Sequence, residues 1–131
     1  MTSSPATTQN LALTILLVRD PARSAAFYRD ILGAEPVEQS STFAMFALPS
    51  GVAIGLWSST TVEPAIAGTA GAAELCFMED DVDGMHASWA ERGVPIAQAP
   101  TDLDFGRTFV ALDPDGHRVR VFRPAAEERA A

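Results

Sequence analysis

The chain has 131 residues, of which 47% are hydrophobic and 20% are charged, and its formal net charge is -8. This size and composition are typical of one globular domain that buries its own core. The acidity argues against nucleic acids and anionic membranes as partners, because both require a basic surface. The single cysteine, Cys76, excludes an internal disulfide.

The two ends of the chain are polar. Residues 1–10 are rich in Ser and Thr and lack the basic start of a secretory signal, so we expect them, like residues 125–131, to form flexible tails. No apolar run approaches the roughly 18 residues of a membrane-spanning helix. We therefore expect a cytoplasmic protein.

The first half predicts a strand, a helix and three further strands. Residues 11–18 are continuously apolar, as in a strand covered on both faces. Asp20 and Pro21 then supply a helix N-cap and first position, and Gly33 ends the helix. A short strand and a hairpin with the turn Leu48-Pro49-Ser50-Gly51 are expected at residues 35–39, 43–48 and 52–58.

The second half repeats this order. After a Thr-, Pro- and Gly-containing connection, a strand at 74–78 leads to a helix that is capped by Asp81 and ended by Gly93. A short strand at 95–98 precedes a hairpin, whose turn is Asp113-Pro114-Asp115-Gly116. When the two hairpin turns are aligned, Gly55 matches Arg120 and Trp57 matches Phe122.

The duplication predicts an α+β fold built from two βαβββ modules. Residues 11–124 form one domain, with modules at 11–58 and 72–124 and a linker at 59–71. Neither module covers its own sheet, so we expect a curled mixed sheet around a cleft. We also expect a homodimer whose clefts are completed across the interface. Tyr28 and Trp89 occupy matching helical positions and are predicted to lie in the core.

The segments LLVRDPARSAAFYRDILGAEP and FGRTFVALDPDGHRVRV resemble the glyoxalase/bleomycin-resistance/dioxygenase group, the vicinal oxygen chelate superfamily. The segments GLWSS, TDLDFGRTF and DPDGHRVRV look most similar to its phenazine-antibiotic resistance and related drug-binding members. The resemblance spans nearly the whole chain, but a fold alone does not select a function.

The resemblance also implies where a metal ion would bind. In metal-using members the ligands stand at the positions of Leu13, Gly55, Glu74 and Arg120. Only Glu74 offers a ligand for a divalent cation, and Arg120 would repel one. We therefore predict no metal, no cofactor and no catalytic residue.

Without metal ligands, the cleft is predicted to be a cup-shaped pocket with a mainly apolar lining. Because strand side chains alternate between faces, residues in phase with these positions face inward. The predicted ligand-binding residues are Leu13, Ile15, Met45, Gly55, Trp57, Glu74, Cys76, Met78, Phe105, Arg107, Val110 and Arg120. Such a lining, apolar with one indole and a few charges, is typical of a pocket for an aromatic ligand.

Several of these side chains have a second interpretation. Trp57 either stacks on a flat ligand or packs against the other module. Phe105 either forms part of the wall of the cleft or packs its loop against the core. Glu74 and Arg120 pair with each other or with the ligand. Neither histidine is expected in the site: His86 packs half-buried on its helix and His117 is solvated.

We therefore expect metal-independent binding and sequestration of a small planar aromatic compound, in the manner of antibiotic resistance proteins. The alternative is an enzyme of the same superfamily, a lyase, isomerase or oxygenase acting on a small carbonyl or aromatic substrate. The sequence leaves open the identity of the ligand, the choice between sequestration and slow turnover, and whether the modules swap between chains.

Overall fold

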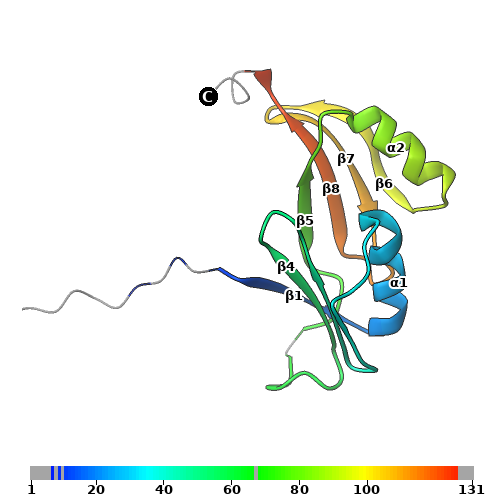
Figure 1. The fold of residues 1–131 in the computed structure, drawn as a ribbon. Helices are drawn as coiled ribbons and strands as arrows, with labels where there is room; N and C mark the ends of the chain where they lie inside the picture. Colours follow the sequence, from blue (N-terminus) through cyan, green and yellow to red (C-terminus); the bar gives the residue numbers. More distant parts are fainter. Residues whose placement is uncertain (1–6, 8, 10, 67, 127–131) are drawn as a thin grey trace, which may run out of the picture.

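The computed structural model describes residues 7, 9, 11–66 and 68–126 (Figure 1). The predicted tails at 1–10 and 125–131 lie almost wholly outside these residues. The elements, in chain order, are β1 (Leu13–Val18), α1 (Pro21–Leu32), β2 (Glu38–Gln39), β3 (Phe43–Ala47), β4 (Ala53–Ser58), β5 (Glu74–Met78), α2 (Val82–Glu91), β6 (Ile96–Leu103), β7 (Gly106–Leu112) and β8 (Arg118–Pro124). Neither described helix is long and apolar enough to span a membrane.

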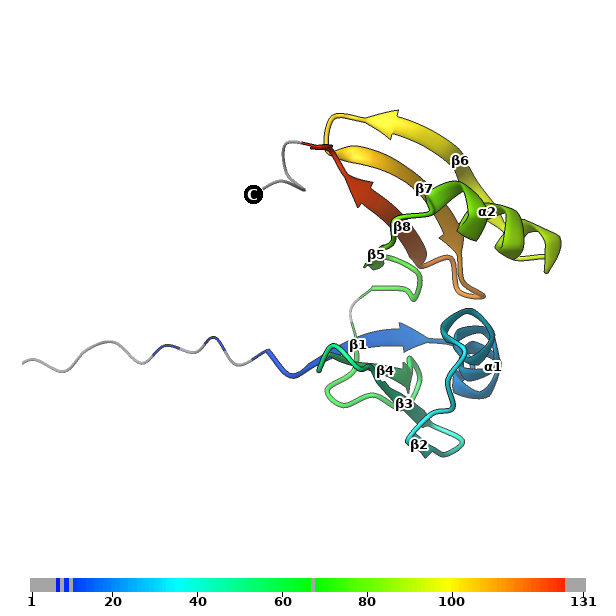
Figure 2. The same ribbon diagram turned by 45° about the horizontal axis from the view of Figure 1, so that its top comes forward.

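The strands form two four-stranded sheets, with the orders β1-β4-β3-β2 and β5-β8-β7-β6. In each sheet the first strand pairs in parallel with the last, and the other pairs are antiparallel. The predicted α+β fold of two βαβββ modules is therefore confirmed. The sheets are hydrogen-bonded separately and do not close into one, and both helices lie on the same side of the molecule (Figures 1 and 2).

Local sequence signals account for both helices. The Asp20 carboxylate accepts from the backbone N–H groups of Ala22 and Arg23 at 3.1 and 3.4 Å, and Pro21 opens α1. Gly33 ends α1 in the left-handed conformation, with φ of 63°. The Asp81 carboxylate caps α2 in the same way, accepting from the Gly84 N–H at 2.9 Å.

The strand β6 is longer than predicted. The sequence pattern predicted that this strand ends at residue 98, before Pro100, but β6 continues to Leu103. Proline is tolerated here because β6 is the edge strand of its sheet, and its pairing with β7 shifts register between Gln98 and Thr101. Gly106 and Arg107 are the first two residues of β7, and both pair with β6.

The core lies between the helices and one face of each sheet. Tyr28 and Trp89 are buried there, as predicted, and the Trp89 ring packs edge-on against Phe109 at a centroid distance of 5.4 Å. His86 is half-buried beside the same Phe109 ring, as expected. Because alternate strand residues fill this core, the intervening residues form the opposite face of each sheet.

The turn between β7 and β8 also fastens the second module to the first. The Asp113 carboxylate accepts a buried hydrogen bond from the Tyr28 hydroxyl at 2.9 Å. The Asp115 carboxylate accepts from Arg19 Nε at 2.7 Å and from the Ser24 hydroxyl at 3.3 Å. The partners Tyr28, Arg19 and Ser24 all belong to the first module, so this turn has a tertiary role in addition to reversing the chain.

His117 completes this contact, and the prediction that it is solvated was wrong. Its side chain is only 3% exposed. Nδ1 accepts from the Ala73 N–H at 3.1 Å, so Nε2 carries the proton and donates to the Leu17 carbonyl at 3.1 Å. The ring thereby joins β1 of the first module to the start of β5, a contact between residues 100 positions apart.

Candidate ligand-binding face

The first module presents an apolar face on the side of its sheet away from the helices. Gly55 at the centre of β4 pairs with Ile15 of β1 and with Met45 of β3. The next inward row places Trp57 between Leu17 and Phe43. These rows contain four of the predicted ligand-binding residues, Ile15, Met45, Gly55 and Trp57, on one continuous surface.

Phe43 is an additional residue of this face. Its ring stands edge-on to the Trp57 indole, at a centroid distance of 6.1 Å and an interplanar angle of 87°. A Cβ at Gly55 would lie 3.1 Å from Phe43 Cζ and 3.3 Å from Ile15 Cγ1, so the glycine makes room for these side chains. The alternation that selected Met45 also places Phe43 on this face, and that signal was available in the sequence.

The second module presents a charged cluster at the matching positions. The Glu74 carboxylate accepts from Arg120 Nε and from Arg118 Nε, each at 2.8 Å. Arg120 also donates to the Thr108 hydroxyl at 3.2 Å. Glu74 and Arg120 therefore pair with each other, and the second arginine leaves the cluster with a net positive charge. Arg118 is in phase with Arg120 along β8 but is not among the predicted ligand-binding residues.

The electrostatics of this cluster keep Glu74 ionised and Cys76 protonated. The hydrogen bond from Arg120 lowers the pKa of the Glu74 carboxyl below its usual range, against a smaller opposing effect of burial. Burial, together with the hydrogen bond to Glu74 and its charge, raises the pKa of the Cys76 thiol. A carboxylate held by arginines is a poor general base, and a protonated thiol is a poor nucleophile.

Phe105 extends this cluster with an aromatic ring. It lies in the turn between β6 and β7, is 36% exposed, and contacts the Phe122 ring at a centroid distance of 6.1 Å. The Arg120 guanidinium stands 5.6 Å from the centre of the Phe105 ring, within range of a cation–π interaction. Phe105 therefore joins the face formed by Arg120 and Phe122.

Arg107 lies on the other side of the sheet. Its guanidinium donates two hydrogen bonds to the Asp83 carboxylate, each of 2.9 Å, and a third to Asp102 at 3.0 Å. Asp83 belongs to α2, so Arg107 points toward the helix and not toward the predicted cup. The inclusion of Arg107 among the ligand-binding residues is corrected on this ground: Arg107 alternates in phase with Phe109, a core residue.

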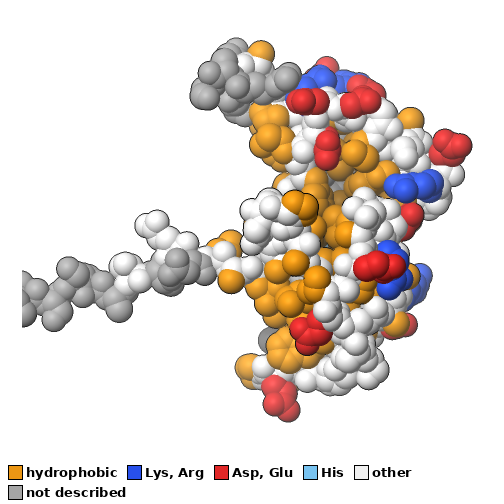
Figure 3. All heavy atoms as spheres, in the orientation of Figure 1, with side chains coloured by type: hydrophobic (Ala, Val, Ile, Leu, Met, Phe, Trp, Pro, Cys, Tyr) orange, Lys and Arg blue, Asp and Glu red, His pale blue; other side chains and the backbone are white. Residues whose placement is uncertain are grey.

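The remaining predicted residues differ in how much surface they offer. Met78 is 65% exposed and Leu13 is half-buried, whereas Val110 is 1% exposed. Val110 pairs with Arg120 and offers almost no surface to a ligand. Beside Cys76 and Met78, a groove of about 320 Å³ runs between the β3–β4 turn and β5. Figure 3 shows hydrophobic side chains gathered where the two modules meet.

The residues present do not fit a divalent metal ion. Leu13 and Gly55 have no donor atom, and both carboxylate oxygens of Glu74 contact arginines. Within the described part of the chain, no three His, Cys, Asp or Glu side chains come together in a geometry that could hold a metal.

Comparison with known proteins gives a consistent result. Residues 10–121 match the family described as Glyoxalase/Bleomycin resistance protein/Dioxygenase superfamily. The chain is 32% identical over 126 residues to the phenazine antibiotic resistance protein EhpR of Enterobacter agglomerans, covering 91% of this chain and 94% of that protein.

Among solved structures, protein ATC0852 from Agrobacterium tumefaciens has a TM-score of 0.81 and 43% identity, covering 91% of this chain and 100% of that one. TnmS3, an antibiotic binding protein from Streptomyces sp. CB03234, has a TM-score of 0.73 at 22% identity, covering 92% of this chain and 100% of that one. At 22% identity, the second likeness is a likeness of fold.

Proposed function

Because the chain belongs to the Glyoxalase/Bleomycin resistance protein/Dioxygenase superfamily, we propose that it binds and sequesters a small planar aromatic compound without a metal ion. One observation carries this proposal: Trp57 stands partly exposed in an apolar face, held edge-on by Phe43. The similarity to a phenazine antibiotic resistance protein supports a role in antibiotic resistance. The cytoplasm is the proposed location.

Stacking and burial supply the binding energy in this proposal. A flat ring on the indole gains about 0.5–1.5 kcal/mol beyond the burial of its own apolar area. Phe43 restricts the Trp57 side chain before the ligand arrives, so less conformational entropy is lost on binding. Arg120, already placed between Glu74 and Phe105, orients a polar group at the edge of the ligand.

A second copy of the chain supplies the other wall of the site. In one chain the face is open, since Met78 is 65% exposed and Ile15 is 38% exposed. Exposed apolar side chains of this kind mark surfaces that pack against a partner. We therefore propose that the functional unit is a homodimer, with the apolar face of one module facing the charged face of another.

Titration of tryptophan fluorescence with phenazines, quinones and glycopeptide drugs tests the binding proposal. We expect saturable quenching by at least one of them. Trp57→Ala should lower the affinity for that ligand by about tenfold or more, since both stacking and burial are lost.

Arg120→Ala and Arg107→Ala form a matched pair for the same titration. Arg120→Ala should weaken binding, whereas Arg107→Ala, on the helix side, should leave it unchanged. Absence of quenching by every compound, or equal effects of the two arginine variants, would contradict the proposed site.

Sedimentation tests the proposed dimer, and metal analysis distinguishes metal-independent binding from an enzyme of the superfamily. The proposal expects the mass of a dimer with ligand bound, and affinity unchanged by treatment with a chelator. A stoichiometric divalent ion in protein purified without chelator, or consumption of the ligand, would instead favour an enzyme of the superfamily. A monomer with full affinity would remove the second copy from the site.

A further inference from the structure

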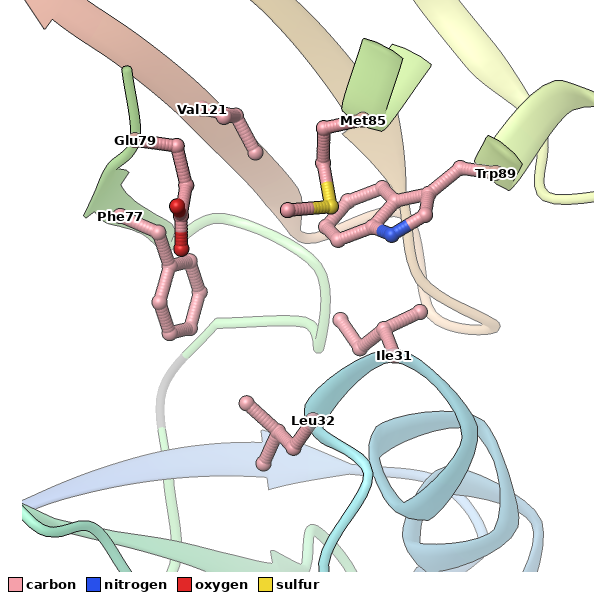
Figure 4. Close-up of a pocket in the computed structure, with 7 residues that line it drawn as sticks. All are labelled: Ile31, Leu32, Phe77, Glu79, Met85, Trp89 and Val121. Carbon is pink, nitrogen blue, oxygen red and sulfur yellow. The ribbon is translucent and has the colours of Figure 1, made fainter. Parts of the chain in front are cut away.

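A separate cavity lies on the helix side of the molecule, between the two modules (Figure 4). Its volume is about 140 Å³. Its walls come from both modules and are formed by Ile31, Leu32, Phe77, Glu79, Met85, Trp89 and Val121. Phe77 lies between Cys76 and Met78 on β5, so the second sheet separates this cavity from those two side chains. Trp57 belongs to β4 of the other sheet and is not part of the cavity lining.

Two polar groups of the lining have no side-chain hydrogen-bond partner in the described part of the chain. Among the described residues, neither the Glu79 carboxylate nor the indole N–H of Trp89 forms a side-chain hydrogen bond, and neither is a buried, unsatisfied group. Figure 4 shows the Glu79 carboxylate above the Phe77 ring, across the cavity from Met85. An otherwise apolar cavity thus carries one negative charge on its rim.

We propose that this cavity binds a small amine with a single aromatic ring, placing the ring between α1 and α2 and the ammonium group at Glu79. The size supports one ring, because an apolar cavity of about 150 Å³ is known to hold benzene. The sign of the charge supports a cation: Glu79 is the only charged residue of the lining, and the chain carries a net charge of -8. The faces of Phe77 and Trp89 also favour a cation.

The occupant would touch both modules at once. Ile31 and Leu32 come from α1 of the first module, whereas Met85 and Trp89 come from α2 of the second. Binding therefore requires the two modules in their observed arrangement and stabilises that arrangement. This inference is independent of the proposed function, because the two sites share no side chain.

The two tryptophans allow each site to be observed alone. Trp57 reports the apolar face and Trp89 reports this cavity, and the chain contains no other tryptophan. In the Trp57→Phe variant we expect benzylamine to change the remaining fluorescence saturably, with a dissociation constant on the order of 1 mM for a ligand of this size. Benzoate, of similar shape and opposite charge, should bind about tenfold more weakly.

Substitutions at the rim and in the wall complete the experiment. In the Trp57→Phe background, Glu79→Gln should lower the affinity for benzylamine by about threefold to fivefold, as expected for an exposed ion pair. The same substitution should reduce the difference in affinity between benzylamine and benzoate. Glu91→Gln removes an exposed carboxylate at the end of α2, outside the cavity, and should change neither affinity. Leu32→Phe should fill the cavity and abolish binding.

The outcomes decide the proposal. No saturable signal at benzylamine concentrations on the order of 10 mM would overturn it, and so would equal affinities for benzylamine and benzoate. Equal effects of Glu79→Gln and Glu91→Gln would show that net charge, not this rim, attracts the amine, and would also overturn it. If Leu32→Phe does not fold, the matched glutamate variants decide alone.

Discussion

The two modules share a backbone but present opposite chemistry on their outer faces. Gly55 pairs with Ile15 and Met45 in the first sheet, just as Arg120 pairs with Cys76 and Val110 in the second. The first set is apolar, whereas in the second set Arg120 belongs to a cluster of one carboxylate and two arginines. The duplicated scaffold thus fixes the positions of side chains without fixing their chemistry.

The cores of the modules differ in a more restricted way. At matching positions, β3 buries Ala44 and then Phe46, whereas β7 buries Phe109 and then Ala111. The large and small residues exchange places, so each helix still covers one aromatic ring and one methyl group. Packing constrains the total volume beneath a helix more strongly than it constrains the order of the residues that fill it.

The largest expected effect tests this equivalence of the two cores. Phe46→Ala and Phe109→Ala each remove a fully buried ring, and each should lower the free energy of unfolding by about 3–5 kcal/mol. Chemical denaturation of both variants provides the measurement. A loss below about 1 kcal/mol in either variant would show that its module does not share the common core.

A smaller effect distinguishes the two hairpin turns. Asp115 contacts Arg19, whereas its counterpart Ser50 in the first turn is exposed. Although burial opposes the shift, hydrogen bonds from Arg19 and Ser24 lower the pKa of Asp115 from 3.8. A lowered pKa in the folded state adds stability above pH 3.8, and this contribution is lost as the pH falls below that value.

Asp115→Asn should therefore reduce the free energy of unfolding by about 1 kcal/mol at pH 7, because Arg19 is largely exposed. The difference from the wild-type chain should shrink once the pH is below 3.8. Chemical denaturation at pH 7 and pH 3 measures this difference in the free energy of unfolding. Ser50→Ala is the control and should change the stability little. A deficit that stays constant with pH would contradict the role of the charge.

The smallest effect concerns the charged face alone. Glu74→Gln removes a charge that raises the pKa of Cys76 and leaves Arg118 and Arg120, which lower it. The thiol should then react about twofold to fivefold faster with an alkylating reagent at pH 8. Cys76 is exposed and is the only cysteine, so the measurement reports on one site. An unchanged or slower rate would show that the charge of Glu74 does not control the reactivity of the Cys76 thiol. Glu91→Gln serves as the control.

Local signals predicted most of the fold. Asp20 and Asp81 cap the helices, and Leu48-Pro49-Ser50-Gly51 and Asp113-Pro114-Asp115-Gly116 reverse the chain, because these residues satisfy or preset their own backbone. The strand β6 was cut short because the effect of Pro100 depends on its place at the sheet edge. That place is set by the pairing of distant residues.

The faces on which the candidate residues lie were predicted in part. Strand alternation placed Ile15, Met45, Trp57 and Glu74 on one side of their sheets, since a period of two needs no tertiary information. Arg107 was assigned to the wrong face, since along β7 it is in phase with the core residue Phe109. Val110 was assigned to the right face, but its burial beneath neighbouring side chains follows from packing.

The sequence by itself determined most of the elements and the alternation of side chains, because both depend on contacts within a few residues. It also showed the duplication, because the order of these local signals repeats along the chain. Only the tertiary structure decided that His117 and Asp115 join the modules, that Phe43 holds Trp57, and that Arg107 faces α2. These contacts join elements whose mutual position follows from packing the whole chain, and a local pattern carries no record of that position.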